Sequence, residues 1–168
     1  MSNVTLEPAG ADRSATLANL FQLYVHDFSE QWAGSGRGEL AEDGRFEPYP
    51  HLEAYWTEPG REAFLIRADG GLAGFVLLND HSHSGLPLDH AVAEFFVARK
   101  HRRGGVGRAA ALAAIRPRPG RWELAVTRRN PGALAFWRAV AAEAASGAVE
   151  ELDTTEPWNG TILRFVVA

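Results

Sequence analysis

The feature that most constrains this chain is a basic, glycine-rich segment at residues 99–108. It follows the apolar stretch 91–98, which predicts a buried strand, and it opens the alanine-rich stretch 107–115, which predicts a helix. Five of its ten residues are Arg or Lys and three are Gly. Glycine lets successive backbone N–H groups point into one cavity, and a helix start adds partial positive charge. The segment therefore predicts a site for a phosphate or pyrophosphate, with a basic surface turn as the alternative.

The rest of the chain predicts a mixed α/β protein. Apolar residues recur with a helical period between Ser14 and Glu30, and Asn130-Pro131 has the chemistry of a helix cap and first turn. Antiparallel hairpins are expected before the basic segment and βαβ-like connections after it. The predicted elements are strand 4–6, helix 14–30, short helix 50–56, strands 63–68, 72–78 and 91–98, helix 107–115, strand 122–127, helix 131–145 and strand 161–167, with a short strand near 149–152.

Composition narrows the class of protein. A chain of 168 residues with 46% apolar residues predicts one domain spanning 1–168. No apolar run approaches the length of a membrane span and no signal-peptide pattern is present, so we expect a cytoplasmic protein without a membrane partner. A net charge of −4 argues against nucleic acid as a partner. The lack of Cys excludes thiolate metal sites, and His81 and His83 fit a polar loop better than a metal pair, so no metal site is expected.

A dinucleotide site is the first alternative for the glycine-rich segment. Gly105, Gly107 and Ala110 match the pattern G-x-G-x-x-G/A formally. Five residues, 99–103, separate the motif from its strand, however, and the acid expected for the ribose would be Glu123, in the middle of a predicted strand. A dinucleotide-dependent oxidoreductase is therefore the less favoured hypothesis.

The stretch 97–108 resembles the acetyl-CoA signature Q/R-x-x-G-x-G/A of the GNAT superfamily of N-acetyltransferases, with Arg102, Gly105 and Gly107 at its fixed positions. Downstream, 122–126 resembles the family's fifth strand, and 130–137 resembles its Asn-x-x-A-x-x-x-Y/F helix start. The match is good in order and spacing from 62 to 140. Residues 23–30 resemble a branch of predicted acetyltransferases.

This resemblance implies a mixed, mostly antiparallel central sheet with flanking helices and a splayed fourth strand at the acetyl-CoA site. It implies a single acetyltransferase domain that moves an acetyl group from acetyl-CoA directly to a primary amine, without a covalent enzyme intermediate. Because many relatives are dimers, a homodimer is a further expectation. The implied cofactor-binding residues are the backbone of Phe95, Phe96 and Val97 for the pantetheine arm, the signature residue Arg102, the amides of Arg103, Gly104, Gly105, Val106, Gly107 and Arg108 for the pyrophosphate, and Trp137. Asn130 would contact the pantetheine or cap its helix.

The reaction also needs a base, and Glu94 is the candidate. Deprotonating a lysine-like amine at pH 7 costs about 4.6 kcal/mol, against about 2 kcal/mol for releasing a thiolate. Glu94 lies on the strand beside the implied thioester, and Phe95 and Phe96 can raise its pKa. An ion pair with a nearby arginine is the alternative role. Many relatives have a tyrosine acid at position 137, where this chain has Trp137, whose indole cannot usefully give up its proton.

The sequence indicates less about the binding site of the acceptor amine. Tyr24, His26 and Asp27 lie within about one turn of the first predicted helix, which in this family borders the acceptor, so we expect substrate contacts there. A solvated helix end is the alternative interpretation of these residues. The departure at Trp137 also leaves a second functional hypothesis, a protein of the same fold that binds acyl-CoA as a sensor or structural ligand without catalysis.

Overall fold

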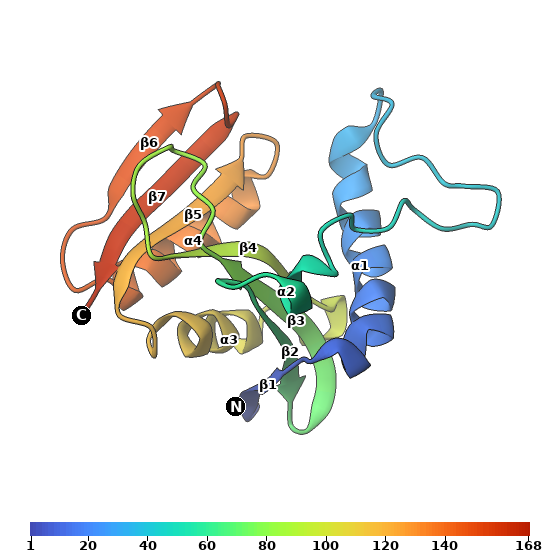
Figure 1. The fold of residues 1–168 in the computed structure, drawn as a ribbon, viewed down its shortest axis with the longest axis horizontal. Helices are drawn as coiled ribbons and strands as arrows, with labels where there is room; N and C mark the ends of the chain where they lie inside the picture. Colours follow the sequence, from blue (N-terminus) through green and yellow to red (C-terminus); the bar gives the residue numbers. More distant parts are fainter.

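The computed structural model describes residues 1–168, and its seven strands form one sheet with the order β1-β2-β3-β4-β5-β7-β6 (Figure 1). Only β4 and β5 are parallel, and every other neighbouring pair is antiparallel. This confirms the expected mixed, mostly antiparallel sheet with flanking helices. The strands are β1 (Val4–Pro8), β2 (Glu62–Ala68), β3 (Gly71–Asn79), β4 (His90–Val97), β5 (Gly120–Thr127), β6 (Glu150–Thr154) and β7 (Gly160–Val167).

Two helical layers cover the sheet. Helices α1 (Ser14–Ser29) and α2 (Ala54–Thr57) pack on one face, and α3 (Val106–Ile115) and α4 (Pro131–Ala144) pack on the other (Figure 1). Because side chains alternate along a strand, neighbouring core residues serve different layers. Leu65, Phe75 and Leu77 join the α1 layer, and Phe64, Val76 and Leu78 join the α3–α4 layer.

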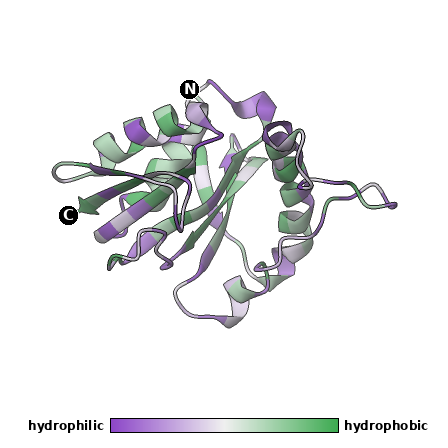
Figure 2. Cartoon of the chain, turned by 90° about the horizontal axis from the view of Figure 1, so that it is seen from above, coloured by the Kyte–Doolittle hydropathy of each residue, from purple (hydrophilic) through white to green (hydrophobic).

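Two of the expectations differ from the structure. The short helix expected over 50–56 is present only as Ala54–Thr57, because the residues before it form tighter turns, with hydrogen bonds to the third residue back. Of the connections after the basic segment, β4–α3–β5 is a true βαβ unit, whereas β5 pairs antiparallel with β7. The short strand expected near 149–152 is β6, which pairs with β7 at the sheet edge. None of the helices is long and apolar enough to cross a bilayer. The loop that projects beside α1 is mostly hydrophilic (Figure 2).

Strand β4 bends in the middle of the sheet and leaves β5. Its register with β3 skips Ala93, since Leu77 faces Glu94 and Leu78 faces Val92. This extra residue is a β-bulge, which kinks a strand and increases its twist. On the other side, β4 pairs with β5 only from His90 to Val92. The expected splay of the fourth strand is therefore present, and the edge of β4 that faces β5 is unpaired over 93–97.

Glu123 ties the loop before β4 to the sheet. Its carboxylate is 1% exposed and accepts hydrogen bonds from the hydroxyl of Ser82 and from the backbone N–H and hydroxyl of Ser84. It also accepts from the backbone N–H of His83 at 2.5 Å and from Nη1 of Arg164 at 2.6 Å. Burial alone would raise the pKa of Glu123, but these donors lower it below its usual value. This acid is fully engaged, so it is not free to bind a ribose.

The close approach of β3 to β4 requires glycine at position 74. A Cβ there would lie 1.9 Å from the carbonyl oxygen of Phe96, whereas a Cβ on Gly71 in the same strand would lie 3.5 Å from that of Ala68. We therefore expect Gly74→Ala to lower the free energy of unfolding by about 1–3 kcal/mol, the usual range for overpacking, and Gly71→Ala to leave it nearly unchanged. Urea unfolding of both variants measures this, and equal stabilities would contradict the assigned β3–β4 geometry.

Candidate functional site

A row of free backbone donors lies at the start of α3. The six N–H groups of residues 103–108 donate no hydrogen bond within the protein. Arg103 (φ 64°) and Gly105 (φ 86°) are left-handed, and a non-glycine residue in that region is a frequent mark of a functional constraint. A Cβ on Gly104 or Gly105 would meet no atom within 4 Å. The space in front of these donors is open, as an anion site requires.

The side chains of the basic segment are used differently from its backbone. Arg99 and Arg102 both pair with Asp27 of α1, and Nε of Arg102 donates to the carbonyl oxygen of Val97 at 2.7 Å. Arg108 makes a two-pronged pair with Glu143 at 2.8 and 2.7 Å. Lys100 and Arg103 form no salt bridge. The side chains of Arg102 and Arg108, both predicted cofactor contacts, are thus held in protein ion pairs.

The three predicted substrate residues on α1 do not share one site. Asp27 lies in the arginine pair at the basic segment; burial alone would raise its pKa, but hydrogen bonds from Arg102 and Arg99 lower it. The His26 side chain is exposed, with its ring 6.3 Å from that of Phe46. Only Tyr24 points at the predicted base.

Tyr24 and Glu94 are in direct contact. The Tyr24 hydroxyl donates to Oε2 of Glu94 at 2.6 Å, and Glu94 forms no salt bridge, so the alternative arginine pair is not made. Burial raises the pKa of Glu94 to about 7, with the Tyr24 hydrogen bond acting in the opposite direction. A carboxyl group that titrates near neutrality is suited to general-base catalysis.

All three tyrosines of the chain belong to the α1 layer of the core; Tyr24 contacts Glu94 directly, and the charge of Glu94 acts on Tyr49 and Tyr55. Burial and the charge of Glu94 raise the pKa of Tyr24, Tyr49 and Tyr55. Tyr49 stacks on Phe21 at 4.4 Å, and Tyr24 meets the same ring edge-on at 5.8 Å. We call Glu94 and the three tyrosines the aromatic cage. Sequence reasoning missed Tyr49 and Tyr55, and their only signal was the scarcity of tyrosine in the chain.

On the opposite side of β4, an aromatic cluster borders the gap to β5. The rings of Phe95 and Trp137 lie 5.0 Å apart, and both contact Phe136. The indole N–H of Trp137 donates no hydrogen bond, unlike those of Trp56, Trp122 and Trp158. Asn130 caps α4 by accepting from the N–H of Ala133 at 3.2 Å, which is the capping role considered for it.

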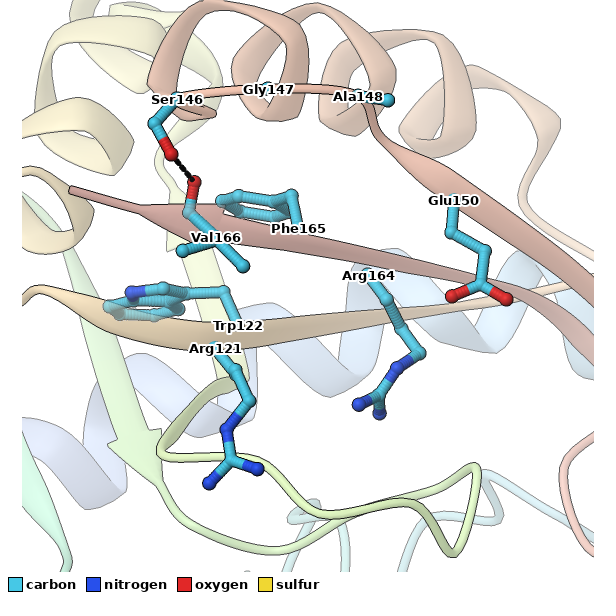
Figure 3. Close-up of a pocket in the computed structure, with 9 residues that line it drawn as sticks. All are labelled: Arg121, Trp122, Ser146, Gly147, Ala148, Glu150, Arg164, Phe165 and Val166. Carbon is cyan, nitrogen blue, oxygen red and sulfur yellow. Dashed lines mark hydrogen bonds between the residues drawn. The ribbon is translucent and has the colours of Figure 1, made fainter.

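A cavity of about 360 Å³ lies elsewhere, between the turn at 146–148 and β7 (Figure 3). Its two arginines are already paired, Arg164 with Glu123 and Arg121 with Asp89. Ser146 closes one wall by donating to the carbonyl oxygen of Val166 at 3.0 Å (Figure 3). Its one unpaired charged side chain is that of Glu150, whose carboxylate would repel an anionic donor. Because the lining also includes no residue of β4, this cavity is not the candidate site. Nowhere in the chain are three or more His, Cys, Asp or Glu side chains grouped to hold a metal ion.

The fold has many structural relatives. It is similar to an acetyltransferase from Thermus thermophilus, with a TM-score of 0.64 and 20% identity over 98% of this chain and 96% of that chain. It is also similar to the PaiA N-acetyltransferase from Thermoplasma acidophilum in complex with coenzyme A, with a TM-score of 0.56 and 12% identity over 98% and 99% of the chains. An aminoglycoside acetyltransferase in complex with coenzyme A gives a TM-score of 0.63 and 12% identity over 98% and 95%.

A match to a sequence family identifies the family of the chain more firmly than these structural similarities at low identity. None of the curated proteins compared with the chain matches it. Residues 17–141, however, match the acetyltransferase (GNAT) family, and this range contains most of α1, the aromatic cage, the splayed β4 and the row of free amides. The chain therefore belongs to the acetyltransferase (GNAT) family.

Proposed function

We propose that this protein is an N-acetyltransferase that moves the acetyl group of acetyl-CoA directly to a primary amine. The observation that carries the proposal is the geometry of β4. Six free amides lie just beyond its end, an unpaired edge runs along 93–97, and a carboxylate with a pKa of about 7 lies at its bulge. The two relatives in complex with coenzyme A support the choice of donor.

The donor would bind through the backbone. The unpaired edge at 95–97 would take hydrogen bonds from the amide groups of the pantetheine arm, as a neighbouring strand would. The amides of 103–108 would hold the pyrophosphate, and Lys100 and Arg103 are the nearby cations not yet paired. Phe95, Phe136 and Trp137 would line the thioester end of the groove.

The chemistry then requires one base. Glu94 takes one proton from the ammonium form of the acceptor, and the neutral nitrogen then bonds to the acetyl carbon. The carbon–sulfur bond breaks as the thiolate leaves, and the second proton that the nitrogen loses passes through water to the thiolate. The products are the amide and the free thiol, and Glu94 returns its proton to water. Tyr24 holds Oε2 of Glu94, which keeps Oε1 for the amine. Trp137 can donate a hydrogen bond to the sulfur but not a proton, so the thiolate is released without a protein acid.

Binding of a CoA compound without catalysis is the second candidate, because no hydroxyl stands at position 137. Replacing the base separates the two functions. In the catalytic case, Glu94→Gln lowers kcat by at least about 100-fold, the usual contribution of a general base, and leaves the Kd for acetyl-CoA within about twofold. Thiol release and calorimetry on the same preparation measure both quantities. If the unmodified protein and the Glu94→Gln variant release thiol at the same slow background rate, the non-catalytic function is favoured.

The donor site has its own test in a pair of matched glycines. Gly105 and Gly70 have similar left-handed φ values, 86° and 81°, and a Cβ on either meets no atom within 4 Å. Asp at either position introduces the same strain and charge, but only at 105 does the charge face the amides. We expect Gly105→Asp to weaken acetyl-CoA binding at least about 100-fold, since like charges at contact cost several kcal/mol, and Gly70→Asp to bind normally. Equal losses in both variants would contradict the assigned site.

The pH profile tests the contact between Tyr24 and Glu94. A base is active when deprotonated, so kcat/KM should rise with pH through an inflection near 7 and fall away below it. The Tyr24 hydrogen bond lowers the pKa of Glu94, so Tyr24→Phe should move the inflection upward by about one unit, the worth of one hydrogen bond to a charge. Tyr49→Phe, which removes a hydroxyl that does not bond to Glu94, is the control. A profile unmoved by Tyr24→Phe would remove Glu94 from the role of base.

A further inference from the structure

Two polar atoms in the aromatic cage have no partner in the protein. Tyr55 is 5% exposed, and its hydroxyl lies beside Tyr49 and Arg61 without a hydrogen bond of normal geometry to either. Oε1 of Glu94 accepts no hydrogen bond either, since Tyr24 donates to Oε2. A buried hydroxyl without a partner is unfavourable, and a bound molecule with a matching polar group would satisfy it. A primary amine supplies N–H donors that match both atoms.

The arginines that border the cage are all held in ion pairs. Arg61 pairs with Glu58 at 2.9 Å while lying over the ring of Tyr55. Asp27 pairs with both Arg99 and Arg102, a cluster that keeps a net charge of +1. An acceptor with a carboxylate close to its amine would find no unpaired cation there, and it would meet the negative charge of Glu94. Amines of the amino-acid type are therefore poor partners for this cage.

The segment that supplies two of the cage tyrosines is strongly acidic. Residues 39–58 contain six carboxylates and one arginine, a net charge of −5, whereas the whole chain carries −4, so the other residues together carry +1. Glu39, Glu42, Asp43, Glu47 and Glu53 are exposed, and the only carboxylate of the segment in a salt bridge is Glu58. The negative charge of the protein is thus concentrated beside the cage.

A cavity lies along this acidic segment. It has a volume of about 580 Å³ and lies between α1 and residues 39–52. Its lining holds three carboxylates against one cation, Glu39, Asp43 and Glu47 against Arg45, together with the ring of Tyr49. Tyr49 is the one residue that this cavity shares with the cage. A second positive charge on the acceptor would be attracted to this cavity while its reacting amine lies at Glu94.

We infer that the acceptor is a primary amine whose carrier bears a second positive charge and no carboxylate near the amine, with Tyr55 and Oε1 of Glu94 binding the reacting nitrogen. This inference rests on the proposed acetyl transfer and adds the class of substrate. The aromatic rings contact the apolar part of the acceptor and attract its positively charged amine. The carboxylates of the acidic cavity then attract the second positive charge of the acceptor.

Three amines of equal length test the charge selection. Butane-1,4-diamine, butylamine and 4-aminobutanoate carry the same reacting amine and a positive, neutral or negative distal group. We expect the highest kcat/KM for the diamine, about 10-fold less for butylamine and at least about 100-fold less for 4-aminobutanoate, as several exposed charges act together. The advantage of the diamine should shrink in 0.5 M salt, because exposed charges are screened. Equal rates, or a preference for 4-aminobutanoate, would overturn the inference and leave acetyl transfer standing.

Variants and a binding arm complete the test. Glu47→Gln should reduce the preference for the diamine over butylamine, whereas Glu150→Gln at the far sheet edge should not. Tyr55→Phe should raise KM for the diamine and butylamine about 10-fold without changing acetyl-CoA binding. If no amine is acetylated, the proposed function fails. Calorimetry on the CoA-saturated protein then still shows whether the site prefers the positively charged amine, because it measures the binding of the three amines without any reaction. Binding of the diamine alone supports it, and equal or absent binding of the three amines overturns it.

Discussion

The site depends on how briefly β4 pairs with β5. Three residues of each strand pair, and the bulge at Ala93 then turns β4 away. Beyond this point side chains alternate between two compartments. Glu94 and Phe96 face the α1 layer and the aromatic cage, whereas Phe95 and Val97 face α3 and α4. One strand therefore separates the proposed acceptor side from the proposed donor side while leaving its own edge free. A sheet with full β4–β5 pairing would have neither the free edge nor the gap.

The two sides are held together by ion pairs rather than by the sheet alone. Asp27, on α1, binds Arg99 and Arg102 at the start of the basic segment, and Arg102 also binds the last carbonyl group of β4. The pairs are partly exposed, so each contributes little stability alone. Their shared carboxylate nevertheless fixes the loop relative to α1. This positions the free amides of 103–108 at one end of the strand that carries Glu94.

Much of this arrangement is predictable from local sequence. The glycine-rich turn, the helix cap at Asn130, the strand carrying Glu94 and nearly every element follow from periodicity and turn chemistry, because these act between near neighbours. The partners of Asp27 lie up to 75 residues away, and nothing in α1 marks it as an ion-pair residue rather than a substrate contact. Tyr49 and Tyr55 lie in a long segment with little regular structure, so only the folded chain brings them to Glu94. Glu123 likewise gains its role from a loop about 40 residues away.

The splayed β4 and its row of amides are proposed to form a site for acetyl-CoA. Isothermal titration of the unmodified protein with acetyl-CoA, and with NADH and NADPH in parallel, decides whether they do. The structure predicts one acetyl-CoA bound per chain with a Kd near the micromolar range, about −8 kcal/mol, and no binding of either dinucleotide. Binding of a dinucleotide without binding of acetyl-CoA would contradict this account and assign the glycine-rich loop to redox chemistry.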